Sequence, residues 1–184
     1  RDYVRKMGLF STEGLRVVLP SAPQRRITCL QGRSMKAWYD YLTDRRGSAE
    51  DDLDEESLAD TRRQVSALLD EERARIRAGA ADYDPSGDGG DRLLIGGCSQ
   101  GCGTALDVAL RYPVRLMAFV GVVGHPLSAT PHGRHPGMPL HFFNGANDKV
   151  MRWSWVEGTI EALRQSGHAV VVHGPLRGVH HGVG

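Results

Sequence analysis

The sequence lacks the features that mark several specialised classes of protein. Its 23 basic and 22 acidic residues nearly balance, so no bulk charge favours nucleic acid or an anionic membrane as a partner. No apolar run of about 18 residues occurs, so no transmembrane helix is predicted, and no signal-peptide pattern is present. The cysteines, Cys29, Cys98 and Cys102, are odd in number and do not indicate a disulfide framework. We therefore expect a protein of a reducing compartment, the cytoplasm.

Length and organisation indicate one folding unit. The 184 residues are enough to bury a sizeable hydrophobic core. The sequence contains no internal repeat and no composition shift that would mark a domain boundary, so residues 1–184 are predicted to form a single domain. Because the chain begins with Arg1 rather than Met, we expect it to be a fragment or a processed product.

Short apolar runs alternate with longer amphipathic segments. Strands are predicted over residues 15–20, 92–97, 116–123, 139–143 and 168–173, and helices over residues 57–78, 100–112 and 152–166. The run 116–123 has no polar side chain, as expected for a parallel strand that is buried on both faces. This alternation predicts an α/β fold with a mostly parallel sheet. Residues 21–26 are predicted to form a turn, and residues 27–42 an irregular excursion over a pocket.

Two groups of residues could be read as metal sites, and neither is convincing. The acidic run from Glu50 to Glu56 lacks the alternating ligands and the glycine of a calcium-binding loop. Carboxylates suit a helix N-terminus, so we interpret this run as a solvated segment before the helix. His132 and His135 lie in a loop rich in proline and glycine, without further ligands nearby in the sequence. No metal and no cofactor are predicted.

The pattern Gly97-Cys-Ser-Gln-Gly101 lies between a predicted strand and a predicted helix. A strand, a sharp turn and a helix with a central serine form a nucleophile elbow, which lifts the serine hydroxyl clear of the sheet. The pattern predicts Ser99 as a nucleophile and the backbone N–H of Gln100 as one donor of an oxyanion hole. The alternatives are a plain glycine-rich turn, or a cysteine nucleophile at Cys98 or Cys102, neither of which occupies the centre of the pattern.

A nucleophilic serine requires an imidazole to take its proton and a carboxylate to hold that imidazole. In enzymes with a nucleophile elbow, the acid and then the histidine follow the serine, each on a loop after a strand. After Ser99, only Asp148 is predicted on such a loop. The other later acids lie on predicted helices: Asp107, Glu157 and Glu161. The loop after the last strand holds both His180 and His181, and their spacing leaves the choice between them open.

Three stretches carry a resemblance to a known family: Gly96-Gly-Cys-Ser-Gln-Gly101, Val17-Val-Leu-Pro-Ser-Ala-Pro23, and Met35-Lys-Ala-Trp-Tyr-Asp40. Together they resemble the acyl-protein thioesterase and carboxylesterase family of α/β-hydrolases, from about residue 15 to the end of the chain. The resemblance implies hydrolysis of long acyl esters or thioesters, including S-palmitoyl groups on proteins and lysophospholipids, through an acyl-enzyme.

The resemblance also assigns roles to particular residues. Asn144-Gly-Ala-Asn-Asp148 is similar to the family's His-Gly-x-x-Asp stretch, with Asn in place of His. Gly178-Val-His-His181 is similar to its Gly-x-x-His, which favours His181 over His180 as the base. The family's excursion borders the acyl channel, which implies that Leu30, Met35 and Trp38 line it.

Two parts of the family pattern have no counterpart in this sequence. They are the opening strands with their His-Gly-x-Gly-Asp oxyanion loop and the closing helix. We therefore expect an α/β-hydrolase fold, a mostly parallel sheet flanked by helices, that lacks its first strands and last helix. Losing one oxyanion donor costs on the order of 10²–10³ in rate, so the activity of this chain stays open. The alternative is a non-catalytic acyl-binding or scaffold relative.

The expected partners follow from this interpretation. They are an acylated protein or a lipid or ester substrate, and nucleic acid is not among them. The interpretation allows for transient contact with a membrane surface. The sequence does not indicate an oligomeric state.

Overall fold

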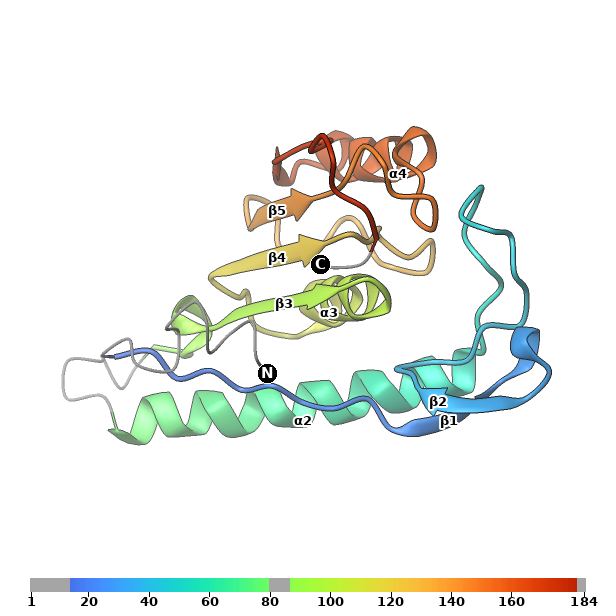
Figure 1. Ribbon diagram of the computed structural model, residues 1–184. Helices are drawn as coiled ribbons and strands as arrows, with labels where there is room; N and C mark the ends of the chain where they lie inside the picture. Colours follow the sequence, from blue (N-terminus) through green and yellow to red (C-terminus); the bar gives the residue numbers. More distant parts are fainter. Residues whose placement is uncertain (1–13, 80–86, 182–184) are drawn as a thin grey trace.

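A computed structural model describes residues 14–79 and 87–181 of the chain (Figure 1). Its elements, in order, are β1 (Gln24–Ile27), a 3-10 turn (Thr28–Leu30), β2 (Arg33–Lys36), α2 (Glu55–Gly79), a second 3-10 turn (Gly90–Arg92), β3 (Leu94–Cys98), α3 (Gln100–Arg111), β4 (Ala118–Val122), β5 (Pro139–Phe143), α4 (Trp153–Gln165) and β6 (Ala169–Val172). The helices and strands predicted from residue 57 onward are therefore confirmed, with bounds that differ by at most a few residues.

The main sheet has the strand order β3-β4-β5-β6, and each neighbouring pair is parallel. In its register Ile95 lies beside Phe119, Phe119 beside Leu140, and Leu140 beside Val170. Helices connect β3 to β4 and β5 to β6. The predicted α/β class with a mostly parallel sheet is thus confirmed, and the carboxyl ends of all these strands meet at one edge of the sheet.

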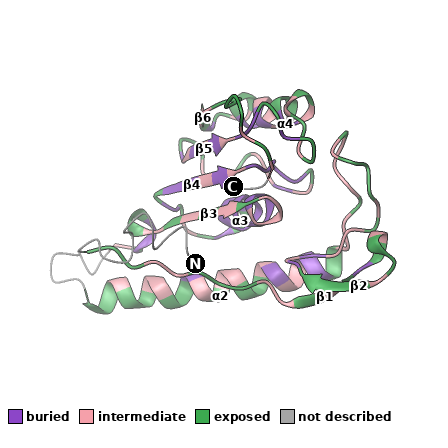
Figure 2. Cartoon of the chain, viewed as in Figure 1, coloured by how far each residue is buried: buried purple, intermediate pink, exposed green. Residues whose placement is uncertain are grey.

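The core lies on one face of this sheet. Phe119, Leu140 and Phe142 belong to one buried cluster with residues of α3 and α4: Leu106, Leu110, Val156, Ile160 and Leu163. Helix α2 packs against the outer side of α3, which is why α3 is buried along most of its length (Figure 2). On the opposite face Leu94 and Val171 are 51% and 42% exposed.

Helix α2 begins where its sequence offers a cap. Asp54 Oδ2 accepts a hydrogen bond from the backbone N–H of Ser57 at 2.8 Å, which satisfies one free donor of the first turn. Hydrogen bonding by Ser57, first through its side chain and second through this N–H, lowers the pKa of Asp54. Glu55 and Glu56 complement the positive end of the helix. The acidic run therefore leads into this helix, as predicted, and its last two residues, Glu55 and Glu56, lie in the first turn.

The strand predicted over residues 15–20 is wrong. This segment runs beside α2, where Arg16 pairs with Glu72 at 2.7 Å, and forms no strand ladder. This segment and the free edge of β3 both line a cavity of about 340 Å³, to which Val18 and Leu94 contribute. A strand needs a neighbour for its backbone groups, and this segment has none among the described residues.

Residues 24–27 instead form a strand, although they belong largely to the predicted turn. Strand β1 pairs antiparallel with β2, so that Gln24 lies beside Lys36 and Ile27 beside Arg33. The tight connection between them contains Gln31 in the left-handed conformation, with a φ of 57°. Asp40 accepts hydrogen bonds from Thr28 N and Thr28 Oγ1 and anchors the connection to the following chain. Strand β1 thus has β2 as its hydrogen-bonding partner in a local hairpin. Residues 15–20 have no such partner among the described residues.

Candidate active site

The turn that follows β3 holds Ser99 in an uncommon backbone conformation, with φ 54° and ψ −122°. Its N–H donates to the carbonyl of Val122 on β4 at 2.9 Å, and its own carbonyl accepts from Cys102 N at 2.9 Å. Gly97 has to be a glycine, because a Cβ atom there would overlap the carbonyl group of Gly101. The sequence therefore forms the sharp turn that the glycine spacing predicts, and the turn presents the serine at the edge of the sheet.

Three side chains from separate loops meet at this edge. Ser99 Oγ lies 2.7 Å from His181 Nε2, and His181 Nδ1 lies 2.8 Å from Asp148 Oδ2. Ser99 follows β3, Asp148 follows β5, and His181 lies after β6. Because a carboxylate only accepts hydrogen bonds, Nδ1 carries the ring proton of the neutral imidazole. Nε2 then carries the lone pair that can accept the serine proton.

Both carboxylate oxygens of Asp148 have hydrogen-bond partners. Oδ1 accepts the backbone N–H groups of Val150 and Met151, each at 2.8 Å, while Oδ2 contacts the histidine. The side chain of Asp148 has no exposed surface, whereas that of His181 is partly exposed. The arrangement fixes an acceptor in one orientation against the imidazole.

The structure separates the two neighbouring histidines. His181 contacts both Ser99 and Asp148, while His180 is exposed and its Nδ1 lies 3.2 Å from the carbonyl oxygen of Asn147. The side chain of Asn147 in turn accepts the N–H of Gly178 at 3.0 Å. The loop contacts around His180 therefore hold it away from the serine.

Gln100 connects the turn to the wall of a cavity. It is the first residue of α3, where N–H groups have no partner within the helix. Its side-chain oxygen accepts from Trp38 N at 2.7 Å, and its side-chain nitrogen donates to the carbonyl oxygen of Tyr39 at 2.8 Å. Sequence reasoning assigned only the backbone of Gln100 and missed this bridge, which joins two segments far apart in the chain.

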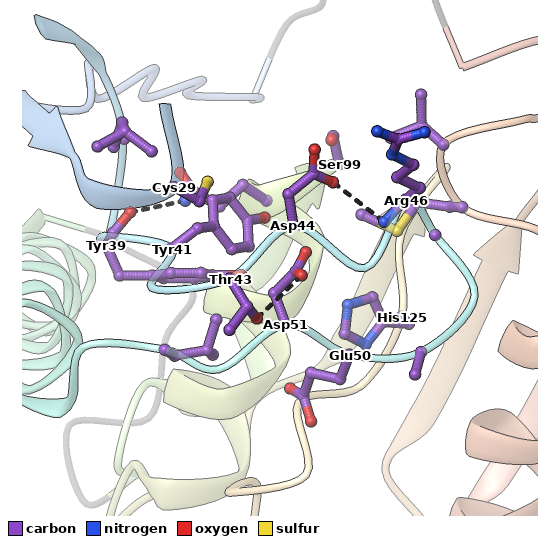
Figure 3. Close-up of a pocket in the computed structure, with 18 of the residues that line it drawn as sticks. Cys29, Tyr39, Tyr41, Thr43, Asp44, Arg46, Glu50, Asp51, Ser99 and His125 are labelled. Atoms are coloured by element: carbon purple, nitrogen blue, oxygen red, sulfur yellow. Dashed lines mark hydrogen bonds between the residues drawn. The ribbon is translucent and has the colours of Figure 1, made fainter. Parts of the chain in front are cut away.

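A cavity of about 550 Å³ opens next to Ser99 (Figure 3). Leu30 and Met35, which the family resemblance assigns to an acyl channel, lie on its wall together with these further apolar side chains: Ile27, Tyr39, Leu127, Met151 and Trp155. Trp38 does not line this cavity. It faces the smaller cavity at the edge of β3, while its neighbour Tyr39 is buried with Leu58 and Leu127. Each of the two adjacent aromatic residues thus contributes to a different cavity.

His125 is a cavity residue that sequence reasoning did not single out. It follows Gly124 directly after β4, and its ring lies on the cavity wall between Arg46 and Glu50 in Figure 3. Burial lowers the pKa of His125, against the opposing effects of a hydrogen bond to Pro126 and the charges of Glu50 and Asp51. The signal available in the sequence was its place at the end of a strand that adjoins the serine turn.

Residues 10–182 match the model of the phospholipase/carboxylesterase family, which is nearly the whole chain. The chain belongs to this family.

Named relatives of the phospholipase/carboxylesterase family resemble the chain to different extents. Acyl-protein thioesterase 1 of Schizosaccharomyces pombe is 35% identical over 108 residues, which cover 59% of this chain and 41% of the relative. The carboxylesterase SOBER1 of Arabidopsis thaliana is 26% identical over 157 residues, which cover 82% of this chain and 63% of SOBER1. The chain therefore spans between 41% and 63% of the length of these two relatives.

Solved structures support the α/β-hydrolase fold of this family member. The crystal structure of Arabidopsis thaliana SOBER1 is 23% identical and has a TM-score of 0.72, covering 91% of this chain and 76% of that structure. Acyl-protein thioesterase 2 of Zea mays is 21% identical with a TM-score of 0.69, covering 100% of this chain and 81% of that structure. Because both sequence identities are below 25%, these similarities support the fold alone.

In this family member the cysteines are poorly suited to nucleophilic attack. All three are free thiols, with Cys98 exposed and Cys102 buried. Burial raises the pKa of Cys98, and the nearby charge of Asp148 raises it further. Burial raises the pKa of Cys102 far above its ordinary value. Since the thiolate is the reactive form, these shifts favour the serine over either cysteine as the nucleophile.

Neither a metal centre nor a membrane span is found in the part of the chain that the structure describes. Within residues 14–79 and 87–181, no three His, Cys, Asp or Glu side chains gather as ligands for an ion. The helices of these same ranges are too short or too polar to cross a bilayer.

Proposed function

We propose that this chain carries the catalytic site of a serine hydrolase that cleaves long-chain acyl esters or thioesters. The observation that supports the proposal is the contact of Ser99 with His181 and of His181 with Asp148, at 2.7 Å and 2.8 Å. The adjoining cavity, lined by Leu30 and Met35, offers an apolar wall to an acyl chain. Family membership supports the same class of reaction.

In the proposed reaction, Ser99 Oγ bonds to the acyl carbonyl carbon while His181 Nε2 takes the hydroxyl proton. Asp148 keeps the ring oriented and stabilises the imidazolium, and the Gln100 N–H donates to the oxygen that becomes negative. The bond from carbon to the leaving oxygen or sulfur then breaks, and the leaving group takes the proton from His181. Water, activated by His181 in the same way, attacks the acyl-Ser99 ester and releases the acid.

Fluorophosphonate labelling tests the assignment of these residues. The probe is expected to modify Ser99, and the substitutions Ser99→Ala and His181→Ala should abolish the labelling. His180→Ala is the matched control, because His180 contacts neither Ser99 nor Asp148, and this variant should label like the unchanged protein. Labelling that persists in Ser99→Ala would remove the serine from the mechanism.

A non-catalytic acyl-binding protein is the second candidate, and one observation favours it. Gln100 supplies only one oxyanion donor, and no described loop before Ser99 carries the His-Gly sequence expected to supply another. Losing one donor lowers the rate on the order of 10²–10³. Binding of a palmitoyl analogue without turnover of p-nitrophenyl esters would favour this candidate, whereas turnover above that of Ser99→Ala would favour the hydrolase.

The remaining expectations are part of the same proposal. We infer that residues 1–184 belong to a single α/β-hydrolase domain whose substrate is an acylated protein, a lipid or another ester, and that nucleic acid is not a partner. The free state of the three thiols is consistent with the cytoplasm. Transient contact with a membrane surface would bring lipid-linked acyl groups to the cavity.

A further inference from the structure

His125 is a buried histidine that the proposed reaction does not use. It is 6% exposed and lines the same cavity as Ser99 and Gln100, and Figure 3 shows its ring among the side chains around that cavity. Gly124 precedes it and packs so closely on the serine turn that a Cβ atom there would lie 2.8 Å from the carbonyl oxygen of Ser99. His125 is therefore positioned by the same strand end that supports the nucleophile.

Two contacts fix the ring and its tautomer. His125 Nδ1 lies 2.7 Å from the carbonyl oxygen of Pro126, and the ring packs against Trp155 with 4.4 Å between centroids. A carbonyl oxygen can only accept, so Nδ1 carries a proton and donates it. Because burial lowers the pKa of His125, the ring is mainly neutral near neutral pH. Its lone pair is then at Nε2, which is a hydrogen-bond acceptor.

The surroundings do not supply a donor for that lone pair. No residue in the described ranges donates to His125 Nε2. The nearby carboxylates of Glu50 and Asp51 are themselves acceptors, engaged by the N–H groups of Ser128 and Arg45. His125 Nε2 therefore has no hydrogen-bond partner within the part of the protein that the structure describes, and it is available to a molecule in the cavity that brings a donor.

We propose that His125 is a specificity-determining residue whose Nε2 accepts a hydrogen bond from a hydroxyl group on the acyl chain of the substrate. This inference rests on the proposed function, because it concerns the cavity beside Ser99. The donor is carried on an alkyl chain, since Leu30, Met35 and Leu127 give the same cavity apolar walls. The substrate class is thus hydroxylated acyl esters or thioesters, in preference to plain ones of the same length.

The test compares esters with one leaving group and different acyl chains. The probes are p-nitrophenyl octanoate and p-nitrophenyl octanoates that carry a hydroxyl at C3, at C7 or at the chain end. For at least one position, kcat/KM should exceed that of plain octanoate by about 3- to 10-fold, the worth of one hydrogen bond between neutral groups. The readout is the kcat/KM of the hydroxylated ester divided by that of plain octanoate. A change that affects catalysis of both esters equally cancels in this ratio.

Three variants identify the source of the preference. His125→Phe keeps an aromatic ring against Trp155 and removes the acceptor, so the ratio should fall to about one. His125→Gln offers an amide oxygen as a replacement acceptor and should keep a ratio above one. His141→Phe makes the same change at a histidine whose ring contacts His173 rather than the cavity, and it should leave the ratio as it was.

The outcomes separate this inference from the proposed function. Hydrolysis of every ester with a ratio of one, or a ratio unaffected by His125→Phe in a variant that still unfolds cooperatively, would overturn the inference and leave the hydrolase standing. If no ester is hydrolysed, binding to Ser99→Ala decides. Tighter binding of the hydroxylated ester that His125→Phe abolishes would support the inference without the activity, and equal binding would refute it.

Discussion

The substitution Asp148→Asn tests whether the carboxylate sets the proton position on His181. In the structure Oδ1 accepts two backbone N–H groups, from Val150 and Met151, at 2.8 Å each. An asparagine keeps these bonds only if its carbonyl oxygen takes the Oδ1 position. Its NH₂ group must then take the Oδ2 position, 2.8 Å from His181 Nδ1. The substituted side chain would therefore donate where the carboxylate accepts.

The expected loss of rate follows from this reversal. A donor facing Nδ1 favours the tautomer with its proton on Nε2, which lies 2.7 Å from Ser99 Oγ. That nitrogen could no longer accept the serine proton. A wrong tautomer in an otherwise intact triad lowers kcat by about 10⁴, which corresponds to about 5.4 kcal/mol of transition-state stabilisation. The fold should change little, because both backbone contacts are retained.

The measurement is kcat for p-nitrophenyl octanoate together with the rate of fluorophosphonate labelling. Asp52→Asn is the matched control, because it removes the same charge at an exposed ion pair with Arg45, and it should stay within about twofold, as surface changes usually do. A value of kcat for Asp148→Asn within tenfold of the unchanged protein would refute the reasoning. Thermal unfolding of all three proteins excludes a loss caused by misfolding.

Three further outcomes follow from the packing around the serine turn and helix α3. Gly97→Ala places a methyl group on the carbonyl of Gly101. Urea unfolding should therefore show that the free energy of unfolding falls by about 2 kcal/mol or more, and fluorophosphonate labelling should be lost. Asp107→Asn removes the charge of a buried carboxylate that pairs with two arginines. The same assay should show that the free energy of unfolding falls by about 3 kcal/mol. This value is near the lower end for a broken buried ion pair, because both arginines are partly exposed. Iodoacetamide should modify Cys98 faster as the pH rises, since its pKa is raised and the thiolate reacts, and should leave buried Cys102 unmodified in peptides analysed by mass spectrometry.

The parts of the fold that the sequence predicted well are those encoded by neighbouring residues. The serine turn was predictable because Gly97 and Gly101 flank Ser99 within five positions, between an apolar run and a helix. Strand β5 was predicted over residues 139–143 and has those bounds. In each case the local pattern and the tertiary environment favour the same conformation.

The parts that could not be predicted depend on partners far away in the chain. Residues 15–20 have the composition of a strand, but they and the free edge of β3 line one cavity and form no ladder. The position of His180 and His181 after the last strand does not distinguish between them. Only the path of the last loop brings His181 to Ser99. The acceptor role of His125 depends on a carbonyl contact and a ring contact that no short pattern encodes.

Under the proposed function, the side-chain bridge from Gln100 connects the cavity wall to the oxyanion donor. Its amide ties the main chain at Trp38 and Tyr39 to the residue whose N–H is proposed to steady the oxyanion. An acyl chain that pushes this wall outward would pull on that residue and shift the donor relative to the reacting carbonyl. Acyl chains that fit the cavity poorly would then react more slowly with Ser99 as well as bind more weakly.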